Sequence, residues 1–187
     1  VPLYGASILA KLRSLVMEHG GLQARKTNMP RAGTQISDSG TYAGVRTCVL
    51  DALQPRLVVE RADVPFPWYG LPKLILAHKM YGFPYHDASG DFGVSRRDNY
   101  VLLDSENGDL EWIKELLETR LARCVFVACR YRMRYLEKQA FEFLPDPSKV
   151  PGFPRPATDA ALAAFLGLSQ EQAACVLSAT SKEYVAF

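Results

Sequence analysis

The stretch "LPKLILAHKMYGFPYHDASGDFGVSRRDNYVLLD" runs from Leu71 to Asp104 and contains two short apolar runs. The first run covers residues 73–78 and the second covers residues 99–104, and both have the length and composition of β-strands. The segment between them is rich in glycine and aspartate, which are typical of turns. We therefore expect these two runs to be neighbouring strands of one sheet.

Upstream of this stretch, the chain predicts one helix, one strand and several loops. Residues 6–18 place apolar side chains at helical spacing, and Gly20 ends the predicted helix. Residues 23–48 are polar and predict a loop and a hairpin. Residues 56–62 predict a short strand, and three prolines make residues 62–72 an irregular connection.

Downstream of Asp104, the hydrophobic period becomes helical. A long helix is predicted from Asp109 onward over "DLEWIKELLETRLARCVFVACRYR", with acidic residues in its first turns. One face of this helix is apolar and consists of Leu110, Ile113, Leu117, Leu121, Cys124 and Ala128.

The C-terminal part follows a proline-rich break at residues 142–156 and predicts two short helices. Thr158 caps the first helix, and Gly167 ends it. Ser169 and Gln172 form a capping box for the second. The predicted fold is α+β, with a mixed small β-sheet packed by a long helix and a C-terminal helical hairpin. We expect an α+β domain over residues 1–145, and a proline-rich linker with the helical hairpin over residues 146–187.

Composition limits the classes of function. The chain has 187 residues, of which 48% are hydrophobic and 22% charged, with a net charge of +2. DNA binding would therefore depend on local clusters of cations. No apolar run reaches the roughly 18 residues of a membrane span, and the first residues lack the pattern of a signal peptide. The four cysteines include no C-x-x-C pair, so we expect buried free thiols and a cytoplasmic location.

The predicted long helix carries a stripe of cations. At about 100° per residue, five basic side chains fall within an arc of about 80°. They are Arg120, Arg123, Arg130, Arg134 and Lys138. Such a stripe is typical of a solvated helix face, and it also suits the binding of consecutive DNA phosphates.

A second basic cluster lies within the opening stretch. Arg96 and Arg97 precede Asn99, and these residue types can bind guanine and adenine edges in the major groove. Lys79 and Tyr81 would add phosphate and stacking contacts. The alternative is that the three neighbouring aspartates, Asp87, Asp91 and Asp98, neutralise the arginines locally.

Other chemistry finds less support. His78, His86, Asp87 and Asp91 have the side chains of zinc or iron ligands, but no known ligand spacing is present, and a structural role for His78 is favoured. The chain contains no G-x-S-x-G, P-loop or G-x-G-x-x-G motif. We therefore expect no metal, no cofactor and no identifiable catalytic residue.

The order of motifs resembles a known family. "PK", the apolar strand "LIL", "FPY", Asp87, Gly90, Gly93 and "YVLL" follow one another as in the specificity region of type IIG restriction-modification enzymes and related adenine-specific DNA methyltransferases. This region is the TaqI-like C-terminal specificity domain, which also has relatives in large DNA viruses. The helix before "FEFLPDPSK" and the tail "ATDAALAAFLGLSQEQAACV" are similar too, so the resemblance covers about residues 70–177.

The resemblance implies a target-recognition module for double-stranded DNA, which would work with a methyltransferase or nuclease subunit. The N/D-P-P-Y tetrapeptide, the glycine-rich cofactor motif and D/E-x-K are all absent, so the module would have no catalysis of its own. The expected DNA-binding residues are Lys73, Lys79, Tyr81, Arg96, Arg97, Asn99, Arg120, Arg123, Arg130 and Arg134. The alternatives are a small metal-dependent nuclease and a protein-interaction subunit.

Overall fold

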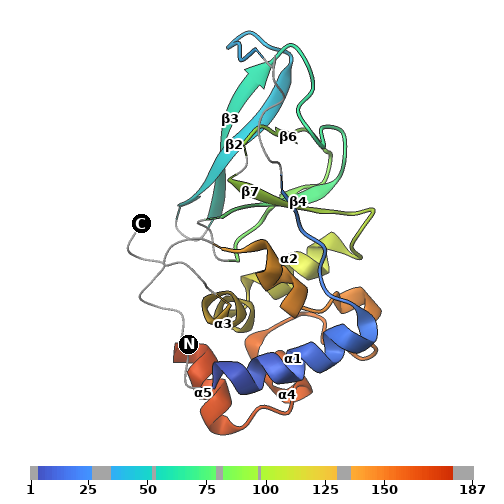
Figure 1. The fold of residues 1–187 in the computed structure, drawn as a ribbon, viewed down its shortest axis with the longest axis vertical. Coiled ribbons are helices and arrows are strands. Elements are labelled where there is room, and N and C mark those ends of the chain that lie inside the picture. The colour runs from blue at the N-terminus through green and yellow to red at the C-terminus, as the bar shows by residue number, and fades with distance from the viewer. Residues whose placement is uncertain are drawn as a thin grey trace.

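A computed structural model gives the structure of the chain (Figure 1). It describes residues 4–26, 35–51, 54–78, 82–96, 98–129 and 136–178. Two small sheets and several helices make up these parts, which confirms the predicted α+β class.

The central sheet contains the two strands of the opening stretch. Its strand order is β1 (Arg25–Lys26), β7 (Asn99–Leu103), β4 (Lys73–Ala77) and β5 (Tyr85–Asp87). Strands β4 and β7 are antiparallel, in a register that pairs Lys73 with Leu103 and Ala77 with Asn99. The prediction that these two runs are neighbouring strands is therefore confirmed.

A second sheet contains a long hairpin, of which the strand predicted at residues 56–62 is one arm and is confirmed, whereas its partner strand was not predicted. Its order is β3 (Gln54–Ala62), β2 (Tyr42–Asp51) and β6 (Gly93–Val94). Strand β2 pairs antiparallel with β3, and the register shifts between Val45 and Thr47, so Arg46 occupies a β-bulge. The bulge interrupts the alternation of buried and exposed residues, which hides the strand from a period-two pattern. The single predicted sheet is thus wrong, because the described residues form two sheets.

The central sheet is buried on both faces because its alternate residues meet different layers. Leu74, Leu76, Tyr100 and Leu102 belong to an apolar cluster shared with the helices. Their neighbours Ile75, Ala77, Val101 and Leu103 join Val45 and Cys48 of β2 in a second cluster. The molecule therefore has three layers, and Figure 1 shows β2 and β3 at one end and the helices at the other.

The predicted long helix is two helices. Helix α2 spans Leu110–Glu118 and α3 spans Arg120–Ala128. Thr119 separates them, because its backbone is extended and its hydroxyl accepts a hydrogen bond from Ala122 N at 3.1 Å. A new N-cap therefore starts a second helix where the apolar pattern alone predicts continuation. The sequence leaves Gly108 or Asp109 as the cap of α2, and Asp109 is the cap, since its side chain accepts from Trp112 N.

The remaining helices pack on the same side of the central sheet. Helix α1 (Gly5–His19) ends at Gly20 as predicted. Two 3-10 helices, η1 (Lys138–Phe143) and η2 (Pro147–Lys149), precede α4 (Asp159–Phe165) and α5 (Gln170–Ser178). No helix in the described ranges is long and apolar enough to cross a membrane.

The caps of the C-terminal helices are those that the sequence predicts. Thr158 accepts a hydrogen bond from Ala161 N, and Ser169 and Gln172 form the reciprocal capping box. Lys11 of α1 donates to the last carbonyls of the α4 region, at Leu166 and Gly167. Residues on both sides of the predicted boundary after residue 145 belong to one apolar cluster.

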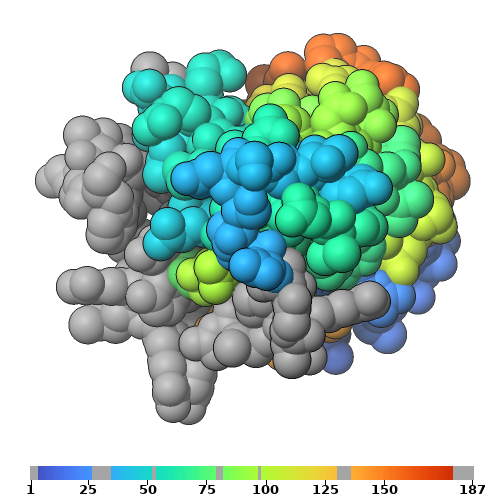
Figure 2. All heavy atoms as spheres, turned by 90° about the horizontal axis from the view of Figure 1, so that it is seen from above, coloured from blue at the N-terminus to red at the C-terminus, as the bar shows by residue number. Residues whose placement is uncertain are grey.

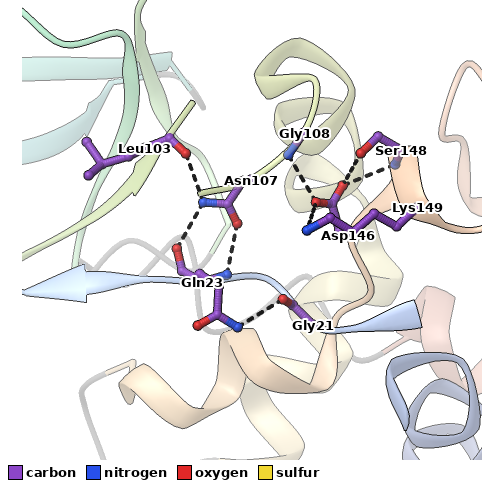
Figure 3. A network of polar contacts seen from close by, with 8 residues as sticks. All are labelled: Gly21, Gln23, Leu103, Asn107, Gly108, Asp146, Ser148 and Lys149. Atoms are coloured by element: carbon purple, nitrogen blue, oxygen red, sulfur yellow. Dashed lines mark hydrogen bonds and ion pairs between the residues drawn. The ribbon is translucent and has the colours of Figure 1, made fainter. Parts of the chain in front are cut away.

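A polar network fastens the N-terminal segment to the segments that precede α2 and α4 (Figure 3). The side chain of Asn107 accepts from Gln23 N at 2.8 Å and donates to Gln23 O at 3.1 Å and to Leu103 O at 3.0 Å. Asp146 accepts from Gly108 N and from Ser148. These two side chains provide partners for backbone groups that no strand or helix satisfies.

We predict that Asn107→Asp lowers the free energy of unfolding by about 2 kcal/mol, because a carboxylate cannot donate to the two carbonyls that it would then face. Gln23→Glu is the matched control, since its side chain is exposed, and should change stability little. Urea denaturation of both variants measures the difference. Equal stabilities of the two would contradict the structural role of Asn107.

Candidate nucleic-acid interface

Lys73 forms a buried ion pair and does not reach the surface. Its ammonium lies 2.6 Å from Asp87 Oδ2 and donates to Leu71 O at 2.8 Å. The side chains of Lys73 and Asp87 are 0% and 3% exposed. Burial lowers the pKa of Lys73, and the neighbouring Asp87 carboxylate opposes that shift. The expectation that Lys73 contacts DNA does not fit its place in the structure.

Asp87 also organises the loop that follows β5. Its carboxylate accepts hydrogen bonds from Asp91 N at 2.9 Å and from Phe92 N at 3.1 Å. Lys73 and Asp87 are direct partners in the β4–β5 register. One buried carboxylate thus joins a strand pair to the turn that leads to β6.

Asn99 is likewise buried, with 0% of its surface exposed. Its side-chain amide donates to Arg46 O at 3.1 Å, Arg96 O at 3.3 Å and Val45 O at 3.4 Å. The burial of Asn99 does not fit the expectation that it reads a base. It instead joins the bulge of β2 to the loop that carries Arg96.

Arg46 and Arg96 are the basic residues that this arrangement presents to solvent. Arg46 is exposed, and among the described residues no acidic side chain pairs with it. Arg96 is 42% exposed, and its Nε lies 3.1 Å from Oε1 of Glu60. The aspartates proposed to neutralise Arg96 do not pair with it among the described residues, because Asp87 binds Lys73 and Asp98 lies beside His78.

Sequence reasoning missed Arg46 because the residue lies in a segment that it assigned mainly to loop. The available signal was the β-branched and aromatic run "TYAGVRTCVL" of residues 41–50. Recognising this run as a strand would have placed Arg46 on the hairpin with β3. The contact of the two strands with Arg96 still depends on long-range packing.

The described members of the predicted cation stripe lie on two different helices. Arg120 and Arg123 belong to α3, which ends at Ala128, and Lys138 begins the 3-10 helix η1. Arg120 donates to Leu177 O at 3.0 Å. The guanidinium of Arg123 lies 4.6 Å from the centre of the Phe83 ring and donates to Glu118 O. Both are thus engaged within the fold.

Five of the expected DNA-binding residues fall outside the residues that the structure describes. They are Lys79, Tyr81, Arg97, Arg130 and Arg134. Their proposed contacts stay predictions. Of the five expected residues that the structure describes, Arg96 and Arg120 are accessible, and Arg96 is the one that Asn99 joins to a further exposed arginine, Arg46.

The alternative metal site is not assembled. Nδ1 of His78 lies 3.6 Å from Asp98, and Nδ1 of His86 lies 2.8 Å from Glu111. The described parts of the chain contain no group of three or more His, Cys, Asp or Glu side chains that could hold a metal ion. Asp87, a member of the proposed set, is occupied by Lys73.

Comparisons of the chain with protein-family models, curated proteins and solved structures find no match. The resemblance to restriction-modification specificity regions therefore stays a prediction, which rests on the motifs from Pro72 to Leu103 and in the tail.

We predict that Asp87→Asn lowers the free energy of unfolding by about 3 kcal/mol, because it leaves the buried Lys73 ammonium without its anion. The double variant Lys73→Met, Asp87→Asn should recover much of this loss, because both charges are then removed. Thermal and urea denaturation measure both effects.

The matched control is Glu106→Gln, which removes the carboxylate of the more exposed ion pair with Arg25. Its effect should be well below that of Asp87→Asn, because water replaces the lost partner. A loss as large in the control, or none in Asp87→Asn, would contradict the role given to the buried pair.

Proposed function

We propose that the chain is a sequence-specific DNA-binding module of a restriction-modification system and that it acts in the cytoplasm without catalysis of its own. A methyltransferase or nuclease subunit would supply the chemistry. The order of motifs supports the assignment to this family. The hydrogen bonds from Asn99 to the carbonyls of Arg46 and Arg96 support the position of the binding site. Neither argument depends on the cation stripe that was predicted for the long helix.

The β2–β3 hairpin has the form of an element that can enter a major groove. A two-stranded antiparallel ribbon fits the groove width, and exposed arginines on it can bind phosphates or guanine edges. Arg46 lies on this ribbon and Arg56 is exposed on its partner strand. Figure 2 looks onto this end of the molecule, where the cyan to green segments form the surface and the helices lie at its rim.

Asn99 would give this site its rigidity. The side-chain amide bonds the carbonyls of Arg46 and Arg96, so the backbones that carry the two guanidinium groups are held together. A fixed backbone reduces the entropy lost when the arginines become ordered on DNA. Glu60 would orient Arg96 in the free protein through their ion pair.

The test begins with selection of bound duplexes from a random pool, followed by a salt titration on the selected sequence. The affinity should fall as salt rises, because bound phosphates release counterions. A slope near zero in log K against log salt would contradict phosphate binding.

We predict that Arg46→Ala and Arg96→Ala each weaken binding to the selected duplex by about tenfold, the effect of one lost arginine contact. Arg13→Ala is the matched control, because Arg13 is an exposed arginine on α1 in the helical layer. Filter binding or fluorescence anisotropy measures the affinities. If all three variants bind equally well, the proposed interface is wrong.

A further inference from the structure

Glu60 holds Arg96 by one edge of its guanidinium group. Nη2 of Arg96 donates to Oε2 of Glu60 at 3.2 Å, and Nε lies 3.1 Å from Oε1. Glu60 lies on β3 and Arg96 follows β6, so this ion pair spans strand β2 between them. A guanidinium carries five N–H donors in a fixed planar fork. With the Nε–Nη2 edge facing Glu60, the end formed by Nη1 and Nη2 presents two further parallel N–H groups.

The pair stays together when Arg96 contacts a ligand, because Glu60 is nearly buried. The side chain of Glu60 is 11% exposed, whereas that of Arg96 is 42% exposed. A carboxylate so far withdrawn from water is costly without its cation. The preceding residue also limits movement, since Ser95 bonds Val45 O through its backbone N–H at 3.0 Å and through its hydroxyl at 3.1 Å. A ligand of Arg96 therefore meets the Nη1–Nη2 end.

An arginine held in this way suits a base edge better than a phosphate. A phosphate is bound through net charge, and Glu60 largely offsets the charge of Arg96. The major-groove edge of guanine is uncharged and offers two acceptors, O6 and N7, which fit two parallel N–H groups. Arg46 differs, because it is exposed and no acidic side chain of the described residues pairs with it. Its full charge remains for a phosphate.

On the basis of the proposed DNA binding, we propose that Arg96 reads one guanine of the target through Nη1 and Nη2. Glu60 is the residue that positions Arg96, and Arg46 contacts a phosphate of the same duplex. The two arginines, whose carbonyls both accept from Asn99, thus have different roles. Arg96 selects the sequence, and Arg46 adds affinity for any sequence.

The test replaces each guanine of the selected duplex in turn with 7-deazaguanine, which lacks the N7 acceptor and keeps its base pairing. Fluorescence anisotropy measures each affinity. One replacement should weaken wild-type binding by about tenfold, because an N–H of Arg96 then has no acceptor. It should have no effect on Arg96→Lys, whose ammonium replaces the guanidinium beside Glu60 and lacks its fork of parallel donors. Arg46→Ala should keep the tenfold loss.

Salt titrations separate the roles of the two arginines. Arg46→Ala should lower the slope of log K against log salt by about one, because one phosphate contact is lost. Arg96→Lys should leave the slope unchanged. The opposite pattern, with the slope dependent on Arg96 alone, would overturn the assignment.

Glu60→Gln examines the positioning role, because it removes the charge of the carboxylate and keeps its size. The charge of Arg96 is then no longer offset, so the affinity for unrelated duplexes and the salt slope should rise, while the loss on 7-deazaguanine should shrink. Glu106→Gln is the matched control, since Glu106 pairs with Arg25 on β1 of the central sheet, and it should bind as wild type. A Glu60→Gln protein that only loses stability, with the wild-type slope and base preference, overturns the role of Glu60.

The failure of this inference differs from the failure of the proposed function. If duplexes bind with a clear salt slope but no guanine depends on Arg96, the inference is wrong and the proposed function stands. If no duplex binds, both are wrong. A single guanine whose 7-deaza form affects the wild type and Arg46→Ala, but not Arg96→Lys, supports both.

Discussion

Lys73 and Asp87 form an ion pair that is almost fully withdrawn from water, and the arrangement of both sheets depends on it. A buried ion pair adds little net stability, but loss of one partner leaves a costly charge. Pairing these two residues therefore discriminates against other registers of β4 and β5. The same carboxylate holds the amides of Asp91 and Phe92, so the turn toward β6 is fixed by the strand register.

Asn99 extends this constraint to the hairpin. Its amide ties the bulge at Arg46 to the loop at Arg96, across the boundary between the two sheets. Polar residues that the sequence suggests as DNA contacts thus act inside the protein, where each has defined partners. The proposed DNA-binding surface consists of the arginines whose backbones those buried residues position.

Local signals in the sequence predict the elements well. The caps at Asp109, Thr158 and Ser169, and the pairing of the strands at 73–78 and 99–104, follow from residue type and period alone. The burial of Lys73 and Asn99 could also have been predicted from the sequence. Each lies an even number of positions from apolar residues of its strand, and so points to the same face as they do. Period-two alternation places them on a covered face only if a second sheet lies there. The bulge at Arg46 hides the second sheet from a period-two pattern. The extended backbone of Thr119 starts a second helix where the apolar pattern predicts that the first continues.

The amides of Asp91 and Phe92 provide the most direct measurement of whether the buried ion pair controls the loop. Native-state hydrogen exchange resolved by residue compares them with the amides of β4. Both amides should exchange as slowly as those of the strand, because the Asp87 carboxylate releases them only when Lys73 and the sheet open together. Exchange at the rate of an exposed loop would contradict it.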